Sequence, residues 1–211
     1  MIGILFDLDG TLLNTLDDLA DAVNFALTAH GYPTRTIQEV RAFVGNGAAN
    51  LISRSVPQGA DPAPIRETYQ AYYKAHSQDK TRPYPGIPEA LVAIQEQFPV
   101  AIVSNKPDHN VKELAAEFFP GVYALGETPD CPRKPAPDML YKALGVLGAD
   151  KLVYVGDSDV DVITATNAGA RCASVLWGFR DEAEIRAAGG AYFCSDPAKL
   201  PALIAELANM E

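Results

Sequence analysis

The chain has 211 residues, of which 48% are hydrophobic and 21% are charged, which is typical of a globular protein rather than a disordered one. Its 17 lysines and arginines against 27 aspartates and glutamates give a net charge of −10, so we expect no nucleic-acid partner. No apolar run approaches the roughly 18 residues of a membrane helix, and residues 1–7 carry no basic leader. We therefore expect a cytoplasmic protein without a membrane partner, whose cysteines serve as packing residues: Cys131, Cys172 and Cys194.

Short apolar runs alternate with helical patterns along most of the chain. Runs without polar alternation suit parallel strands that are covered on both faces. Such strands are predicted at residues 2–8, 100–103, 122–125, 152–155, 171–176 and 191–194. Helices are predicted at residues 88–97, 108–118, 138–147, 160–168 and 197–209. This order predicts an α/β fold, a Rossmann-like parallel sheet with helices on both faces.

One segment departs from this alternation. Residues 16–80 show apolar stripes of helical period and a capping-box pattern at Thr36 and Glu39, but no convincing strand. About 60 residues is long for a simple crossover between parallel strands. We therefore expect a catalytic core domain of residues 1–15 and 81–211, with an all-helical cap domain, residues 16–80, inserted after the first strand.

Polar groups gather where three of the predicted strands end. The first strand runs into residues 7–11 (DLDGT), the second into 104–106 (SNK), and the strand at 152–155 into 156–161 (GDSDVD). Ligands bind beyond the carboxyl ends of strands in open α/β sheets. We therefore expect these groups, together with Lys134 from a proline-rich loop, to form one acidic pocket with a cationic counterpart.

Acids gathered in this way need a cation. Two unit charges about 4 Å apart repel by about 4 kcal/mol at an effective dielectric constant near 20. Oxygen ligands without histidine or cysteine favour Mg²⁺ over zinc. Asp7, Asp9 and Asp157 therefore predict a magnesium site. Each acid alone would also suit a helix N-terminus, so the prediction depends on their convergence with Lys134.

These residues resemble the signatures of the haloacid dehalogenase superfamily. FDLDGTL at residues 6–12 is similar to the first signature, and Ser104, Lys134 and GDSDVD at residues 156–161 are similar to the second, third and fourth in order. The chain most resembles the phosphoglycolate phosphatase-like subgroup, which carries a helical cap after the first signature.

The resemblance implies a role for each of these acids and for the lysine. Asp7 would be the nucleophile that forms an aspartyl-phosphate. Asp9 would protonate the leaving oxygen and then act as the base for water. Lys134 would neutralise both Asp7 and the bound phosphate. The metal would be held by Asp7, by Asp9 through its main-chain carbonyl and by Asp157, with Asp161 holding metal-bound water.

Substrate-binding groups are expected in two places, and the resemblance implies those in the core. In the core, Ser104 and the amide of Asn105 would bind phosphoryl oxygens, with Thr11 assisting. In the cap, a flexible turn could offer backbone N–H groups to the far end of the substrate, at Gly45, Asn46 and Gly47. An ordinary turn between helices would explain the same pattern.

Two further features have open interpretations. Arg41 or Arg54 could meet a substrate carboxylate, although a solvated charge on a helix is the simpler interpretation. The turn at residues 177–180 (WGFR) follows a predicted central strand, and we expect its aromatic side chains to pack rather than to contact substrate.

We expect a Mg²⁺-dependent phosphatase acting on a small phosphorylated metabolite, with phosphoglycolate as the leading candidate. The second acid, Asp9, points to phosphoryl transfer, because dehalogenating members of the superfamily lack it and need no metal. A pyrophosphatase, a sugar phosphatase, a nucleotidase and a phosphosugar mutase remain open. A non-catalytic signalling module that holds a phospho-aspartate is the alternative of a different class. We expect a monomer or a weak homodimer.

Overall fold

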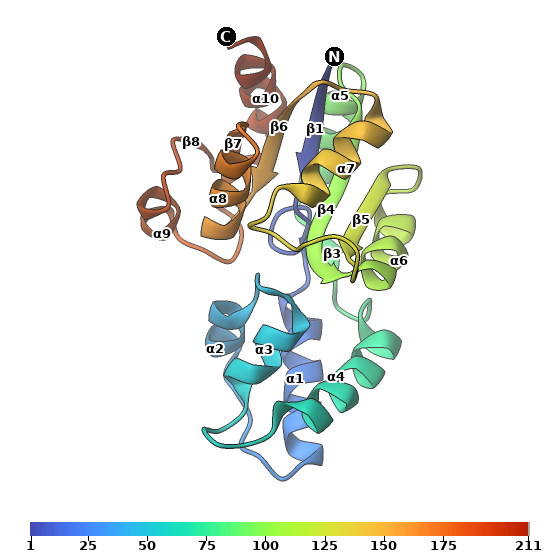
Figure 1. Ribbon diagram of the computed structural model, residues 1–211, viewed down its shortest axis with the longest axis vertical. Coiled ribbons are helices and arrows are strands. Elements are labelled where there is room, and N and C mark those ends of the chain that lie inside the picture. The colour runs from blue at the N-terminus through green and yellow to red at the C-terminus, as the bar shows by residue number, and fades with distance from the viewer. Residues whose placement is uncertain (211) are drawn as a thin grey trace.

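A six-stranded sheet forms the centre of the protein in a computed structural model that describes residues 1–210 (Figure 1). Every pair of neighbouring strands is parallel, in the order β5-β4-β1-β6-β7-β8. The strands are β1 (Ile2–Phe6), β4 (Val100–Pro107), β5 (Tyr123–Glu127), β6 (Lys151–Gly156), β7 (Arg171–Val175) and β8 (Tyr192–Cys194). The predicted α/β fold with a parallel sheet is confirmed.

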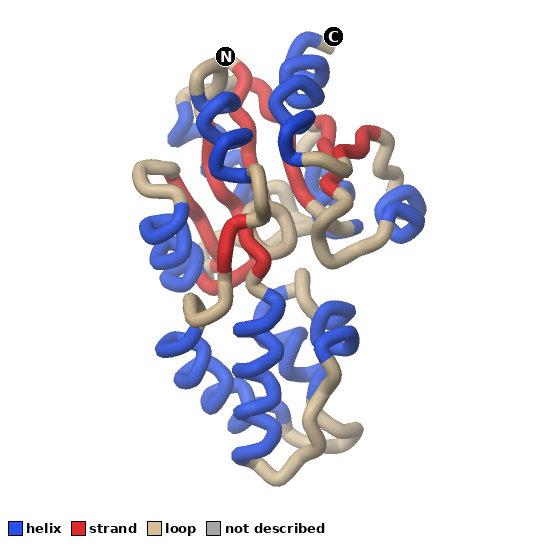
Figure 2. The backbone as a smooth tube through the Cα atoms, turned by 180° about the vertical axis from the view of Figure 1, so that it is seen from behind, coloured by secondary structure: helices blue, strands red, loops and turns tan. Residues whose placement is uncertain are grey.

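Helices cover both faces of this sheet (Figures 1 and 2). One face packs against α5 (Ile87–Gln95), α6 (Asp108–Phe118) and α10 (Leu200–Asn209), which follows a short 3₁₀ turn, η1 (Pro197–Lys199). The other face packs against α7 (Asp138–Leu147), α8 (Asp159–Asn167) and α9 (Glu182–Ala187). Strand residues alternate between the two hydrophobic clusters: in β1, Ile4 and Phe6 face one and Leu5 the other.

Four further helices lie beyond one end of the sheet and pack around a hydrophobic cluster of their own (Figure 1). They are α1 (Leu16–Ala29), α2 (Ile37–Phe43), α3 (Gly47–Ser55) and α4 (Pro62–His76). We call residues 16–76 the helical segment. Within residues 1–210, none of the helices has both the length and the apolar character needed to cross a bilayer.

The chain leaves and re-enters the sheet region through a small antiparallel pair, β2 (Leu13–Asn14) and β3 (Arg82–Pro83). The buried carboxylate of Asp18, near the start of α1, accepts hydrogen bonds from the backbone N–H groups of Lys80 and Thr81 and from the Thr81 hydroxyl. A buried carboxylate is stable only with such donors. The two connections are therefore fastened to each other next to the sheet.

The structure differs from the predicted elements mainly at their ends. β1 ends at Phe6 instead of residue 8, and β4 continues through Ser104, Asn105 and Lys106, which an apolar pattern does not reveal. α9 was not predicted, because its six residues are too few for a clear apolar stripe; it begins at a capping box formed by Asp181 and Glu184.

Candidate active site

Strand register brings two acids to one edge of the sheet. Phe6, the last residue of β1, pairs with Ile102 of β4 and with Val155 of β6. Asp7 follows Phe6 directly, and Asp157 follows the last residue of β6. Parallel strands end on the same side, so both acids lie at the carboxyl edge, where open α/β sheets bind ligands.

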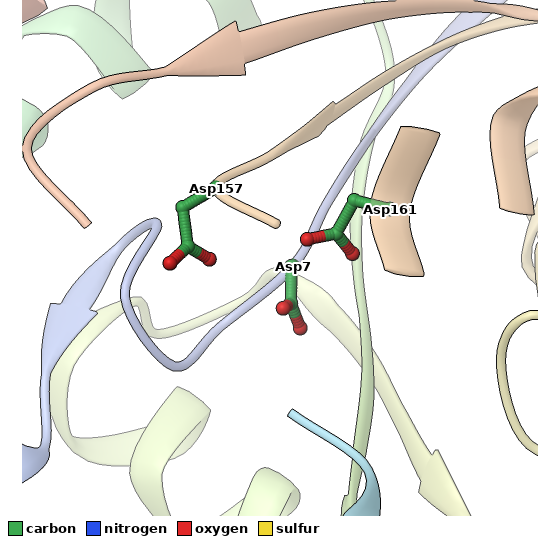
Figure 3. Close-up of side chains that lie close together, drawn as sticks. All are labelled: Asp7, Asp157 and Asp161. Atoms are coloured by element: carbon green, nitrogen blue, oxygen red, sulfur yellow. The ribbon is translucent and has the colours of Figure 1, made fainter. Parts of the chain in front are cut away.

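Three carboxylates, those of Asp7, Asp157 and Asp161, lie close together at this edge (Figure 3). One oxygen atom from each lies within 4.8 Å of the others, and the side chains are buried. Burial raises the pKa of Asp7 to about 7, with further contributions from the charges of Asp161 and Asp9, against the opposing effect of Lys134. Burial and the charges of Asp161 and Asp7 raise the pKa of Asp157 to about 8. The negative charges of these three carboxylates are therefore only partly balanced by neighbouring positive charge.

Lys134 is the cation that lies among these carboxylates. Its ammonium nitrogen is 3.0 Å from an oxygen of Asp7 and 2.8 Å from one of Asp161, and it donates a hydrogen bond to the Tyr154 hydroxyl. Burial alone would lower the pKa of Lys134, but the charges of Asp161 and Asp7 raise it above its ordinary value. Three carboxylates and one ammonium leave two negative charges when all are ionised. A divalent cation would balance them.

The start of α8 positions Asp161. Its oxygen Oδ2 accepts hydrogen bonds from the backbone N–H and the hydroxyl of Ser158, which closes a capping box. The other oxygen, Oδ1, faces Lys134 and Tyr154. Asp161 is therefore fixed at both oxygens and presents charge to the lysine in one orientation.

Asp157 is held by donors from two loops. Its Oδ2 accepts a hydrogen bond of 2.6 Å from the backbone N–H of Phe179, and its Oδ1 accepts one of 3.1 Å from the Thr11 hydroxyl. A Cβ atom at Gly10 or Gly178 would overlap the Asp157 side chain, and Gly10 also has a φ of +84°. Glycine at both positions therefore makes room for this carboxylate.

Asp9 stands outside the group of three and has a different partner. Its two carboxylate oxygens each lie 2.9 Å from the ammonium of Lys106, and the Thr15 hydroxyl donates to one of them at 2.7 Å. The Lys106 side chain is only 5% exposed, and its ammonium lies 4.9 Å from the centre of the Tyr73 ring, on α4. Residue types at 104–106 do not predict this ion pair, because Asp9 lies almost a hundred residues earlier in the chain.

A pocket opens between the strand ends and the helical segment. On the sheet side its lining includes Asp7, Asp9, Ser104 and Asp157. On the side of the helical segment the lining includes Gly45, Gly47, Leu51 and Tyr69. Residues from α3, α4 and the turn before α3 therefore cover the acids at the carboxyl edge of the sheet.

The remaining predicted substrate-binding residues lie in different settings. The Asn105 side chain donates to the carbonyl oxygens of Gly45 and Lys134 and accepts from the Lys134 N–H, so it ties two loops together. The hydroxyl of Thr11 faces Asp157. Asn46 precedes α3 without a side-chain capping bond and is absent from the pocket lining found within residues 1–210.

The turn at residues 177–180 does more than pack. Arg180 donates to the carbonyl oxygens of Arg41, Ala42 and Val44, while Arg41 donates in return to that of Gly178. These bonds join the helical segment to the loop that holds Asp157. A short turn with one arginine carries no pattern that would have predicted this, because the bonding partners are backbone oxygens more than a hundred residues away.

Arg41 and Arg54, either of which could have met a substrate carboxylate, therefore have different hydrogen-bond partners. Arg41 joins the two parts of the chain through Gly178, whereas Arg54 lies over the Phe43 ring at 4.6 Å and donates to the carbonyl of Ala42. Arg54 is absent from the pocket lining found within residues 1–210.

Residues 4–175 match the family described as haloacid dehalogenase-like hydrolase. The chain belongs to this family, and it is a phosphatase. It is 35% identical over 192 residues to a phosphoglycolate phosphatase of Cereibacter sphaeroides, covering 85% of this chain and 87% of that protein. It is 33% identical over 212 residues to a phosphoglycolate phosphatase of Pseudomonas syringae pv. syringae, covering 93% and 77%.

Solved structures agree with this assignment. A crystal structure from Lactobacillus delbrueckii subsp. bulgaricus, provisionally identified as a phosphoglycolate phosphatase, is 34% identical and superposes with a TM-score of 0.90, covering 96% of this chain and 97% of that one. A predicted phosphoglycolate phosphatase from Haemophilus somnus is 28% identical, with a TM-score of 0.83 and coverage of 93% and 95%.

Proposed function

We propose that this protein hydrolyses a small organic phosphate monoester with Mg²⁺, through an aspartyl-phosphate on Asp7, and that phosphoglycolate is the leading substrate. The observation that carries the proposal is the buried carboxylate of Asp7, 3.0 Å from the Lys134 ammonium, in the pocket lining. The relatives that bear the name phosphoglycolate phosphatase support the choice of substrate.

The residues fit a magnesium ion, because their donors are oxygens and their uncompensated charge is two. The side chains of Asp7 and Asp157 and the main-chain carbonyl of Asp9 would hold it, and Asp161 would hold its water. When bound, the ion neutralises the carboxylates and polarises a phosphoryl oxygen.

The chain's own residues divide the reaction between them. A carboxylate oxygen of Asp7 attacks phosphorus, while the carboxyl of Asp9 gives its proton to the leaving oxygen. Asp9 then accepts a proton from the water that releases phosphate from Asp7. Lys134 holds Asp7 and neutralises the phosphoryl group. Ser104 and the amide of Asn105 bind phosphoryl oxygens, with Thr11 assisting.

We further propose that residues 16–80 act as a cap over a core formed by residues 1–15 and 81–211. The pocket lies between the helical segment and the strand ends, which supports this division. The turn at Gly45, Asn46 and Gly47 would face the part of the substrate distant from phosphorus. A closed cap excludes bulk water from the aspartyl-phosphate. We expect a cytoplasmic enzyme that is monomeric or weakly dimeric.

Phosphate release from a panel of small phosphorylated compounds, including phosphoglycolate, pyrophosphate, sugar phosphates and nucleoside monophosphates, tests this proposal. We expect hydrolysis with Mg²⁺, none with EDTA, and none from Asp7→Asn, with phosphoglycolate showing the highest kcat/KM. Activity that persists in EDTA or in Asp7→Asn would reject the mechanism. A higher kcat/KM for another ester would reject only the substrate.

A further inference from the structure

The cationic side chains around the pocket differ in how fully they are engaged. Lys134 is shared among Asp7, Asp161 and Tyr154. The guanidinium of Arg180 bonds to backbone carbonyls of the helical segment, and its Nε lies 3.8 Å from Asp159. Neither can leave these partners to reach the part of a substrate distant from phosphorus without breaking several buried or partly buried contacts.

Lys106 is in a different position. The two hydrogen bonds that its ammonium donates both go to the oxygens of Asp9, and the ammonium also lies over the face of the Tyr73 ring. An ammonium has three N–H donors, and an aromatic face is a weaker partner than an anion. When Asp9 turns an oxygen to the leaving group, Lys106 loses one of its two acceptors. A buried ammonium then needs another acceptor close to the leaving oxygen.

We propose that Lys106 recognises a carboxylate of the substrate that is one carbon away from the ester oxygen, so that the enzyme selects phosphate esters of 2-hydroxy acids. This inference rests on the proposed function. The lysine belongs to the pocket lining, on the side of Asp9, and lies under Tyr73 of the helical segment. Lys106 therefore lies where we expect the leaving group to bind, between Asp9 and the helical segment.

Simple geometry supports this assignment. The leaving oxygen must come within about 2.7 Å of an Asp9 oxygen to receive its proton. The Lys106 nitrogen is 2.9 Å from each of those oxygens. In an ester of a 2-hydroxy acid, the nearer carboxylate oxygen lies roughly 3 Å from the ester oxygen. One leaving group can therefore bond to Asp9 through its ester oxygen and to Lys106 through its carboxylate.

The residues around Lys106 would strengthen its pairing with a substrate carboxylate and limit the size of the leaving group. Tyr69 and Tyr73 stack at 5.6 Å on α4, and both rings are almost wholly buried. Apolar rings lower the local dielectric constant, which strengthens the attraction between an ammonium and a carboxylate. Leu51 and Tyr69 line the pocket on the side of the helical segment, and we expect them to keep the carboxylate of a longer chain out of line with Lys106.

The test compares kcat/KM for three phosphate esters: phosphoglycolate, ethyl phosphate, which lacks the carboxylate, and the phosphate ester of 3-hydroxypropionate, which places it one carbon further away. The wild-type enzyme should prefer phosphoglycolate over both by roughly 10- to 100-fold. Lys106→Met should reduce that preference to within about threefold, and Lys106→Arg should retain part of it. The exposed Lys112→Met, on α6, is the matched control and should keep the wild-type preference.

Each other outcome contradicts the inference in a distinguishable way. A wild-type enzyme without preference for the carboxylate would overturn it even if no Lys106 variant folds. Equal losses on all three esters in a folded Lys106→Met would show that Lys106 only positions Asp9. Failure of the wild-type enzyme on every ester, including an aryl phosphate measured first, would reject the proposed function itself.

Discussion

The ammonium of Lys134 lies 2.8 Å from a carboxylate oxygen of Asp161, and the two side chains are 2% and 0% exposed. Asp161 is held by the capping box at the start of α8, so the lysine is anchored to a carboxylate whose position is fixed. The ion pair with Asp161 therefore holds the Lys134 ammonium in place, next to the Asp7 carboxylate that it also contacts.

Removing the lysine should therefore harm both stability and activity. Lys134→Met leaves two buried carboxylates without their counter-charge, and we expect the free energy of unfolding to fall by about 3–5 kcal/mol. Phosphatase activity should fall by roughly 10³-fold or more. Chemical denaturation and steady-state kinetics measure the two effects. The exposed Lys142→Met, on α7, should change neither, and a Lys134→Met protein with wild-type stability would contradict the buried pairing.

The metal-free protein should lose stability as the pH rises. The pKa values of Asp7 and Asp157 lie at about 7 and about 8, above the ordinary value of 3.8. The folded state therefore binds these protons more tightly than the unfolded state. The stability that they contribute is complete below about pH 4 and is lost as the pH passes through 7 and 8. Thermal melts measure this loss, and Asp157→Asn should lose less stability than the wild-type protein between about pH 7 and pH 8, because only Asp7 still titrates there.

Magnesium should reverse that loss. Protons compete with the cation for the same carboxylates, so the rise in Tm caused by Mg²⁺ should be larger at about pH 8 than at about pH 5. Differential scanning fluorimetry in EDTA and in Mg²⁺ measures the rise. An equal rise at both pH values, or the same rise in Asp157→Asn, would argue against cation binding at these carboxylates.

Asp9→Asn separates the two halves of the reaction. An aryl phosphate has a leaving group that needs little protonation, so Asp7 should still be phosphorylated, whereas the water that releases phosphate has lost its base. We expect a burst of aryl alcohol equal to the enzyme concentration, followed by turnover reduced by roughly 10²–10⁴-fold. Stopped-flow absorbance records the burst. Slow release without any burst would mean that Asp9 is needed equally in both steps.

Arg180→Ala tests the connection between the helical segment and the sheet. Three carbonyl oxygens, those of Arg41, Ala42 and Val44, would lose a charged donor. We expect faster hydrogen exchange at residues 41–47 and a KM increased by about tenfold, since each such bond contributes about 1.5–3 kcal/mol at most. The exposed Arg66→Ala, on α4, is the control. Unchanged exchange in Arg180→Ala would mean that other contacts hold this turn.

Much of the fold could be predicted because buried parallel strands and amphipathic helices leave strong periodic signals. Asp108–Phe118 and Asp138–Leu147 form helices over the predicted ranges. The extension of β4 through Ser104 to Lys106 could not be predicted, since its residues are polar and their burial depends on distant loops. The pair β2–β3 is likewise set by chain geometry rather than by apolar pattern.

The candidate site followed from residue types at strand ends, because strand order places those ends together. Three of the predicted acids do meet, and Lys134 lies among them. The roles of Lys106 and Arg180 were not found, because each depends on a partner far along the chain. Charge alone does not tell an exposed lysine from one buried beside a carboxylate. The assigned roles and the bound metal stay predictions.

Rapid acid quenching followed by peptide mass spectrometry is the most direct test of an aspartyl-phosphate on Asp7. With phosphoglycolate and Mg²⁺ under single-turnover conditions, the peptide that contains Asp7 should gain the mass of one phosphoryl group and lose it as phosphate is released. With an aryl phosphate in place of phosphoglycolate, Asp9→Asn should accumulate this species, and Asp7→Asn should lack it with either substrate. Phosphate release at the normal rate with no phosphorylated peptide at any time point would contradict the account.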